Sequence, residues 1–315
     1  MTKIAILGHQ EVTALVIENL MDFDIHLHTI IGLTPEKGLG ISEYVDLKIL
    51  ATEADITHSC IVDYSLETPD SHNIFIKESF DIVIVVGWSR LIPHTLLSLV
   101  DTQFIGWHGG PFLPPRCRGR AVVNWAIINN ETDFFVYTML IDEGVDSGRI
   151  VDTSFVSIQL DETAQSLYIK CAIEIAKLFK NFISGNGEVV GITQVSDGAT
   201  YLPKRYAEDG EIDWLLPANV IARLVRALSK PFPSAWTQMH GNKLYVKRAS
   251  VLDINLDQRY KIGQIVNILR SSELIIQTSK GLLLIEDYEF HSTYDLKRLD
   301  LLSNSNMVRN VTKMY

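Results

Sequence analysis

The chain has 315 residues, which is enough for two domains that each bury a hydrophobic core. Hydrophobic residues make up 47% of it and charged residues 21%, as in an ordinary water-soluble protein. The net charge of −10 is unevenly divided, because the first 204 residues hold 13 Lys and Arg against 26 Asp and Glu, and the rest holds 15 against 12. Since an excess of 13 negative charges repels a nucleic-acid backbone, the composition argues against nucleic acid as a partner.

The N-terminal residues and the cysteines predict a cytoplasmic protein. The first three residues run directly into a strand-like segment, with no apolar segment and cleavage site of a signal peptide. No apolar run reaches the roughly 20 residues of a membrane-spanning helix, so no membrane association is expected. Cys60, Cys117 and Cys171 form no C-x-x-C pair, which argues against disulfides and a zinc site. We expect no metal.

Short apolar runs that alternate with helical patterns predict an α/β domain with a mostly parallel sheet. Strands are expected over 3–7, 25–33, 80–87, 104–108, 134–140 and 150–158. Helices are expected over 13–21, 70–78 and 122–128, and from the residues after Asp161 to about 184. A flexible loop is expected over 34–40. The first run ends at Gly8 without a G-x-G-x-x-G motif, so a dinucleotide-binding dehydrogenase is not favoured. His26 and His28 share one face of the second expected strand and lack a third ligand at metal-binding spacing.

Two helices have recognisable ends. Asp70 or Ser71 is expected to cap the helix that runs through Glu78, and Asp161 the last helix of this half. That last helix should end at the Gly-Asn-Gly sequence of 185–187. Its buried face is predicted from apolar residues at helical spacing, namely Leu167, Cys171, Ile175, Leu178 and Phe182.

The pattern changes near residue 203, so we divide the chain into domains at 1–203 and 204–315. A helix is expected over 218–229, followed by strands over 243–251, 261–269, 273–278 and 282–286. Asn242, Gly263 and Gly281 mark the turns between them. Large aromatic residues of this half, Trp214, Phe232 and Trp236, are interpreted as core or domain-contact residues.

Two loops of the first half carry candidate site residues. The segment 88–93 follows the most apolar strand, at the carboxyl end where open α/β sheets bind ligands. His108 ends another apolar run beside two glycines. From the residues alone, His108, Trp88 and Arg90 are each as compatible with packing as with a role in a site.

Several motifs, in collinear order, resemble the 10-formyltetrahydrofolate-dependent formyltransferases. His108 is followed by Leu-Pro, by Arg-Gly-Arg-Ala at 118–121 and by Asn124-Trp125, and Asp-Glu-Gly-Val-Asp-Ser-Gly stands at 142–148. The segments 208–214, 225–227 and 230–235 are similar to the C-terminal domain of two-domain members. The resemblance implies a Rossmann-like catalytic domain followed by a small, OB-like β-barrel domain.

The resemblance also implies the reaction. Such enzymes transfer a formyl group from 10-formyltetrahydrofolate, a co-substrate, to an amine through a tetrahedral intermediate that bears an oxyanion. His108 would be catalytic as a base or as an oxyanion partner, and Asp146 would support it by favouring the imidazolium form. The family's asparagine, two residues before the histidine, is Gly106 here.

The binding residues implied by the resemblance fall into two groups. The folate would be bound by Trp88, Ser89, Arg90, Leu91, Ile92, Ile141, Asp142, Glu143, Gly144 and Val145. The acceptor substrate would be bound by Gly109, Arg118, Arg120 and Asn124, with the arginine forks suited to diphosphate or carboxylate. A solvated acidic turn at 142–143 and arginines that only hold their loop remain alternatives.

Three acceptors come into question within the family. Glycinamide ribonucleotide formyltransferase resembles the first domain only. Methionyl-tRNA formyltransferase carries a long basic insertion after the second strand, whereas residues 32–42 here contain only Lys37 and Glu36 as charged residues. We therefore expect a nucleotide-sugar N-formyltransferase that acts on an amino sugar and, by analogy, forms a homodimer. The alternatives are methionyl-tRNA formyltransferase and, because of Gly106, a non-catalytic paralogue that binds folate or a sugar nucleotide.

Overall fold

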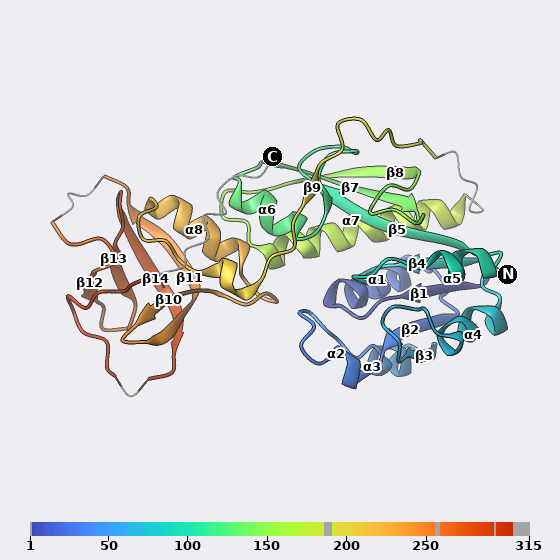
Figure 1. Cartoon of the computed structure of the whole chain (residues 1–315), viewed down its shortest axis with the longest axis horizontal. Helices are drawn as coiled ribbons and strands as arrows, with labels where there is room; N and C mark the ends of the chain where they lie inside the picture. The colour runs from blue at the N-terminus through green and yellow to red at the C-terminus, as the bar shows by residue number, and fades with distance from the viewer. Residues whose placement is uncertain (1, 186–190, 256–258, 293, 305–315) are drawn as a thin grey trace. The chain divides into compact units, whose positions relative to one another are not determined.

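The computed structural model describes residues 2–185, 191–255, 259–292 and 294–304, which group into two compact units (Figure 1). The first unit comprises the chain up to Val122, Asp133–Ser157 and Leu167–Leu202; the second comprises Val123–Thr132, Ile158–Ser166 and the chain from Pro203 onward. The two short segments that group with the second unit were not foreseen from the sequence. Within the described residues, no helix is long and apolar enough to cross a membrane.

A seven-stranded sheet forms the first unit, in the order β3-β2-β1-β4-β5-β7-β8. Its strands are β1 (Ile4–Leu7), β2 (Thr29–Leu33), β3 (Thr57–Ile61), β4 (Ile82–Val85), β5 (Gln103–Gly110), β7 (Asp133–Leu140) and β8 (Ile150–Ser157). The strands from β3 to β5 are parallel, and β7 and β8 add antiparallel pairs at one edge. Every residue of β1, β2 and β4 is buried, as expected for strands covered on both faces.

The helices of this half are α1 (Glu11–Asp22), α2 (Pro35–Gly38), α3 (Lys48–Glu53), α4 (Pro69–Glu78), α5 (His94–Leu99), α6 (Val122–Ile128) and α7 (Ala164–Ser184). On one side of the sheet, the core includes Phe75 of α4 and Leu96 of α5, which pack with Leu7 and Val83 of the strands. The five residues predicted to form the buried face of α7 are all buried. That helix ends directly before Gly185, and residues 186 and 187 lie outside the described residues.

Both predicted helix caps were wrong, because the capping residue must directly precede the first helical residue. The side chain of Thr68, not of Asp70 or Ser71, caps α4 by accepting a hydrogen bond from the Ser71 amide at 3.4 Å. In the same way, Thr163 and not Asp161 precedes α7, and its hydroxyl accepts from the Ser166 amide at 3.1 Å.

Strand β2 begins four residues later than predicted. Asp24 takes a left-handed conformation at φ 59°, and the Ile25 amide is still bonded to the Leu20 carbonyl at 3.0 Å, so the turn after α1 uses these residues. His26 and His28 therefore precede the strand. The segment 34–40, expected as a loop, contains the single helical turn of α2.

The second unit holds a five-stranded antiparallel sheet in the order β10-β11-β14-β13-β12. Its elements are α8 (Ala218–Ala227), β10 (Ala235–Met239), β11 (Asn242–Asp253), β12 (Ile265–Ile268), β13 (Leu274–Gln277) and β14 (Leu282–Phe290). Bridges from Leu301 to Gln264 and from Ser303 to Gln238 join the last described segment to both edges of the sheet. This segment closes the sheet into the small barrel that the resemblance implies.

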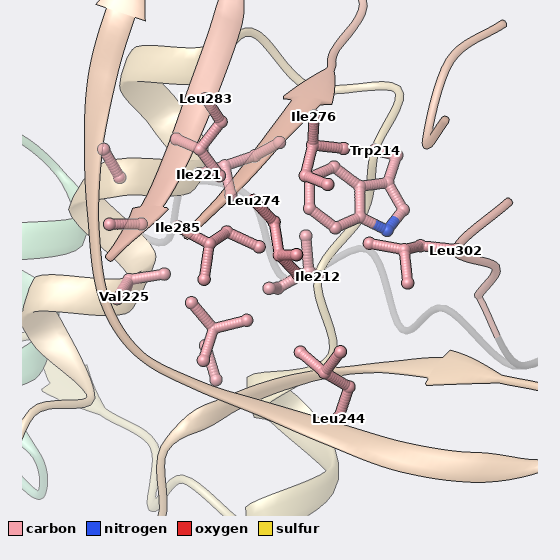
Figure 2. Close-up of a cluster of buried hydrophobic side chains, with 14 of the residues drawn as sticks. Ile212, Trp214, Ile221, Val225, Leu244, Leu274, Ile276, Leu283, Ile285 and Leu302 are labelled. Carbon is pink, nitrogen blue, oxygen red and sulfur yellow. The ribbon is translucent and has the colours of Figure 1, made fainter. Parts of the chain in front are cut away.

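The core of the second unit lies between α8 and the strands, as Figure 2 shows. Ile221 and Val225 of α8 face Leu283 and Ile285 of β14. Trp214 joins this core, and its indole N–H donates to the Thr237 hydroxyl at 2.9 Å. Trp236 is also buried, whereas Phe232 is partly exposed.

Candidate active site

A pocket of about 410 Å³ opens in the first unit where the direction of the strand order reverses. From β1 the chain proceeds to β2 and β3 on one side, and β4 and β5 lie on the other. Such a switch point leaves a crevice at the carboxyl ends of the strands. The wall includes Gln10 after β1, residues 87–92 after β4, residues 106–108 of β5, 119–122, 139–142, 144–148 and Tyr168 of α7.

His108 lies within β5 and not at its end, because the strand continues to Gly110. Pairing with β4 stops at Gly106, while pairing with β7 places Tyr137 opposite His108. Beyond Gly106, one edge of β5 is therefore free to border the pocket. This explains how a residue inside a strand, only 8% exposed, comes to line the pocket.

The two nitrogens of His108 face different groups. Nε2 lies 2.9 Å from the carbonyl oxygen of Cys117. A carbonyl can only accept, so Nε2 carries the hydrogen and donates it. Nδ1 lies 3.7 Å from Oδ2 of Asp146, and both side chains are largely buried. The imidazole and the carboxylate that the motifs predicted as partners are thus brought together from β5 and from the turn before β8.

The carboxylate of Asp146 is also fixed by the backbone. Its Oδ2 accepts a hydrogen bond of 2.8 Å from the Gly119 amide. Gly119 has φ 101°, and a Cβ there would lie 2.5 Å from the Leu202 carbonyl oxygen, so only glycine fits this position. The motif glycine therefore has a geometric purpose, since it turns an amide toward the carboxylate.

The residues predicted to bind folate line this pocket, except Glu143. The Glu143 carboxylate instead pairs with His94 at 2.6 Å, and both side chains are 67% exposed. The backbone amides of Leu91 and Val145 make no hydrogen bond within the described part of the chain. Nor has the buried indole N–H of Trp88 a described partner. A ligand with amide-like acceptors fits such a set of unused donors.

Of the four predicted acceptor-binding residues, only Arg120 lines the pocket. Its Nη2 donates to the Ser89 carbonyl at 2.6 Å, and the side chain is exposed. Gly109 faces away, because a Cβ there would lie 2.6 Å from the Phe134 ring and 2.8 Å from the Phe135 carbonyl oxygen. Gly109 therefore packs against β7 and does not line the pocket, in contrast to the prediction.

Arg118 and Asn124, also predicted to bind the acceptor, do not line the pocket. Arg118 is 3% exposed and donates to Gln194 and Tyr201 instead of facing the pocket. Asn124 is 2% exposed and belongs to the second unit, where its amide donates to the Ala227 carbonyl at 2.7 Å. Both side chains turn toward the protein interior, so neither is placed to contact a substrate in the pocket.

Gln10 and Tyr168 are among the pocket residues that the sequence analysis did not name. Gln10 follows β1 and could have been found from its place at the carboxyl end of a strand; its Nε2 lies 3.4 Å from the Ser89 hydroxyl. Tyr168 stands next to the apolar face of α7 and gave no signal of its own. Burial raises the pKa of its phenol well above the ordinary value.

Two titratable groups near the pocket have shifted pKa values. Burial lowers the pKa of His9 to about 4; its ring lies 5.3 Å from that of Trp88, and its Nε2 is 3.0 Å from the Tyr64 hydroxyl. Burial, with a smaller effect from Glu11, raises the pKa of Glu43 to about 7.

Comparison with known proteins now identifies the family. Residues 3–182 match the family model described as formyl transferase, and residues 205–304 match the formyl transferase C-terminal domain. The chain belongs to the formyl transferase family. It is 34% identical over 254 residues to a methionyl-tRNA formyltransferase of Agathobacter rectalis, a match that covers 79% of this chain and 78% of the relative. The resemblance inferred from the motifs and the assignment as a formyltransferase are confirmed.

Solved structures share the fold of this formyltransferase. An N-formyltransferase from Helicobacter canadensis, in complex with folinic acid and dTDP-3-aminofucose, has a TM-score of 0.63 at 16% identity, over 92% of this chain and all of that one. HypX from Aquifex aeolicus, in complex with tetrahydrofolic acid, has a TM-score of 0.64 at 17% identity, over 92% of this chain but 44% of that one. The predicted α/β fold with a second, β-sheet domain is confirmed.

Proposed function

We propose that this formyltransferase transfers the formyl group of 10-formyltetrahydrofolate to the amine of a nucleotide-linked amino sugar. The observation that carries the reaction is the pair of His108 and Asp146 within one pocket, with Nδ1 and Oδ2 at 3.7 Å. The imidazole can take the proton that an attacking amine must lose, and the nearby carboxylate stabilises the imidazolium that results.

His108 exchanges this proton through Nδ1. Its Nε2 hydrogen is held by the Cys117 carbonyl, which leaves Nδ1 as the nitrogen on the Asp146 side. Deprotonation raises the nucleophilicity of the amine as it adds to the formyl carbon, and the charge on the formyl oxygen then needs hydrogen-bond donors. When this intermediate collapses, the bond between the formyl carbon and N10 of the folate breaks, and N10 takes up the proton held by His108, so that tetrahydrofolate leaves.

The co-substrate is proposed to lie along residues 88–92 and 141–145. The unused amides of Leu91 and Val145 and the indole N–H of Trp88 are donors for the carbonyl and ring nitrogens of a pterin. When bound, 10-formyltetrahydrofolate supplies the activated formyl group. The protein's contribution is to orient this group toward the His108–Asp146 pair and to exclude water around it.

The acceptor assignment rests on charge and on one short segment. Arg120 is an exposed arginine in the pocket wall, suited to a diphosphate. The segment after β2 forms only the single turn of α2, with Lys37 beside Glu36, and offers no basic surface for a tRNA stem. A small diphosphate-linked sugar needs no extended basic surface. The excess of acidic residues in the first 204 positions is therefore compatible with such an acceptor.

Methionyl-tRNA is the second candidate acceptor, favoured by the 34% identity to a methionyl-tRNA formyltransferase. The experiment is turnover of 10-formyltetrahydrofolate with a panel of dTDP- and UDP-linked amino sugars, and with initiator methionyl-tRNA at several salt concentrations. Formylation of a sugar but not of the tRNA supports the proposal. Steeply salt-dependent formylation of the tRNA alone would replace it. Folate binding without any turnover would favour the non-catalytic paralogue.

A further inference from the structure

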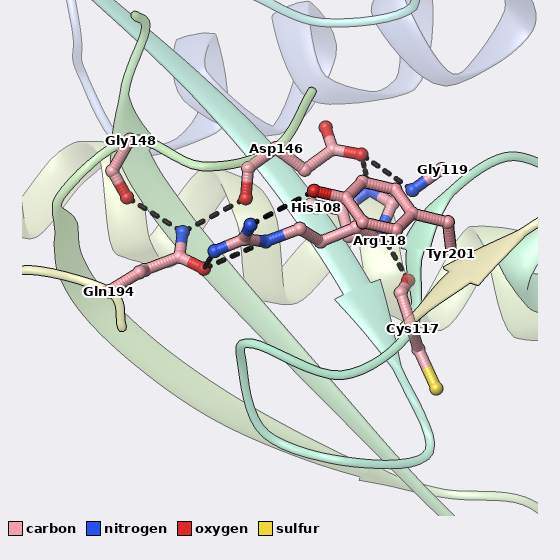
Figure 3. A network of polar contacts seen from close by, with 8 residues as sticks. All are labelled: His108, Cys117, Arg118, Gly119, Asp146, Gly148, Gln194 and Tyr201. Atoms are coloured by element: carbon pink, nitrogen blue, oxygen red, sulfur yellow. Dashed lines mark hydrogen bonds and ion pairs between the residues drawn. The ribbon is translucent and has the colours of Figure 1, made fainter. Parts of the chain in front are cut away.

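We propose that Gln194 and Arg118 are positioning residues that hold Asp146 beside His108. The inference rests on the proposed function, because it concerns the same proton-transferring pair. Gln194 lies between α7 and β9 (Tyr201–Leu202), and the sequence analysis gave it no role. Figure 3 shows it between the Asp146 turn and the Arg118 side chain.

All four hydrogen-bonding positions of the Gln194 amide are used. Its Nε2 donates to the Asp146 carbonyl at 3.0 Å and to the Gly148 carbonyl at 2.7 Å. Its Oε1 accepts from Arg118, from Nη2 at 2.7 Å and Nε at 3.3 Å. An amide between two carbonyls and one guanidinium has only one favourable orientation. Gln194 therefore ties the backbone of the Asp146 turn to a buried side chain at a fixed distance.

Arg118 is buried and bonded on both sides of its guanidinium, which fixes its contact with Gln194. It is 3% exposed, and its remaining Nη1 donates to the Tyr201 hydroxyl at 3.2 Å. Both sides of the guanidinium are thus bonded to residues of the segment 194–201. The Arg118 backbone is bonded to the same segment, because the Arg118 amide donates to the Thr200 carbonyl at 2.9 Å. Lysine could not make such forked contacts.

Three consecutive residues connect the whole site. The Cys117 carbonyl accepts from His108, the Arg118 side chain donates to Gln194, and the Gly119 amide donates to the Asp146 carboxylate (Figure 3). Strand β6 (Arg118–Gly119) keeps this order through its parallel pairing with β9. The contacts form a closed ring from the Asp146 carboxylate through β6 and Gln194 back to the Asp146 carbonyl.

The ring supports a backbone conformation that is costly by itself. Asp146 has φ 50°, in the left-handed region that aspartate adopts at a modest energetic cost. Hydrogen bonds from Gln194 to the carbonyls of residues 146 and 148 hold the turn in this conformation. Without them, the carboxylate is expected to drift from His108. Displacement of a reacting group by about 1 Å lowers rates by about 100-fold.

The first test separates turnover from binding. Gln194→Glu keeps the size of the side chain and the acceptor for Arg118, but replaces the two N–H donors by a carboxylate oxygen that repels both carbonyls. We expect kcat to fall about 10- to 100-fold with KM for both substrates nearly unchanged. Arg118→Lys should show the same split. The exposed Gln165→Glu and Arg116→Lys are the matched controls. A change in KM alone, or a kcat equal to that of the controls, would overturn the proposal.

The second test needs no substrate. The sequence contains a single Arg-Gly pair, residues 118–119. After labelling with ¹³C-carbonyl arginine and ¹⁵N-glycine, a spectrum that selects amides bonded to a ¹³C carbonyl therefore shows one signal, that of Gly119. Its bond to the Asp146 carboxylate should place the amide proton downfield. We expect an upfield shift in Gln194→Glu and in Gln194→Leu, and none in Gln165→Glu. An unmoved signal in both Gln194 variants contradicts the inference.

These readouts distinguish failure of the inference from failure of the proposed function. If no amino sugar is formylated but the Gly119 signal moves, Gln194 still positions Asp146 and the acceptor assignment is wrong. If a sugar is turned over but the Gln194 variants match their control in kcat and in the Gly119 signal, the acceptor assignment stands and the positioning role is wrong.

Discussion

The Cδ1 atom of Ile141 occupies the space beside Gly106. A Cβ built on Gly106 would lie 2.5 Å from this atom, and the next nearest atoms are 3.5 Å or more away. The glycine and the isoleucine therefore form a complementary pair, in which one side chain fills the room that the other gives up. This explains how the pocket wall can lack the family's asparagine without leaving a void.

The pair predicts coupling between the two positions. Gly106→Asn alone should lower the free energy of unfolding by about 1–3 kcal/mol, because Ile141 must shift. Combined with Ile141→Ala, the loss should be smaller than the sum of the two single losses. Chemical denaturation of the four proteins of this double-mutant cycle measures the coupling. Additive losses would show that Ile141 does not obstruct residue 106.

The same double variant tests the missing oxyanion donor. An oxyanion-hole donor typically contributes about 10²–10³ in rate. If the asparagine amide reaches the formyl oxygen, kcat of Gly106→Asn/Ile141→Ala should exceed that of Ile141→Ala by at least about tenfold. Steady-state turnover with a sugar substrate is the measurement. Equal kcat values would mean that another donor already serves the oxyanion.

The strands were predictable where burial dictates the residues. Strands β1 and β4 are covered on both faces, so apolar β-branched runs announce them. Strand β3 lies at the edge of the sheet and is mostly polar and partly exposed, which left no pattern to detect. The two-residue strands β6 and β9 exist only because of their pairing with each other, which no local pattern encodes.

The candidate site was predictable in residue type but not in side-chain direction. The motif supplies arginines at alternate positions, of which Arg116 and Arg120 are exposed and Arg118 is buried. Which one turns inward depends on the pairing of β6 and on Gln194, 76 residues away in sequence. His108 and Asp146 were named as site residues because they stand in the family motifs. No sequence pattern could show that the Cys117 carbonyl accepts a hydrogen bond from Nε2 of His108 and so determines which nitrogen carries the hydrogen.

Removing either member of the proton-transferring pair should affect turnover. His108→Ala and Asp146→Asn should each lower kcat by about 10²–10⁴ with the fold retained. Asparagine is chosen at residue 146 because φ there is 50°, which asparagine tolerates and alanine does not. Stopped assays with a sugar acceptor measure kcat, and circular dichroism checks the fold. The exposed His26→Ala is the control, and near-normal turnover in either variant contradicts the proposed roles.

Arg120 should contribute to acceptor binding and not to the chemical step. Loss of its fork in Arg120→Ala is expected to raise KM for the nucleotide sugar about tenfold, with kcat little changed, since a contact made equally in ground and transition states affects binding. The exposed Arg116→Ala, on the same loop, controls for loss of one positive charge. An unchanged KM would reduce Arg120 to its structural bond with the Ser89 carbonyl.

Glu43 should make the stability of the protein depend on pH. Its pKa is raised from 4.5 to about 7 by burial, so the folded state binds the proton more tightly than the unfolded state. The stabilisation from the protonated carboxyl is full below pH 4.5 and is lost as pH rises through 7. His9 has the opposite effect on the free energy of unfolding. Its pKa is lowered from 6.5 to about 4, so the stabilisation from the neutral imidazole is lost as pH falls through that range.

Between pH 4.5 and 6.5 the two slopes therefore offset each other in the parent protein. Glu43→Gln removes one of them. Relative to the parent, this variant should gain stability as pH rises from 4.5 to 7, by up to about 3 kcal/mol. Denaturant unfolding of both proteins from pH 4 to pH 8 measures the difference, with the exposed Glu36→Gln as control. A difference that does not change with pH would show that Glu43 titrates alike in the folded and unfolded chains.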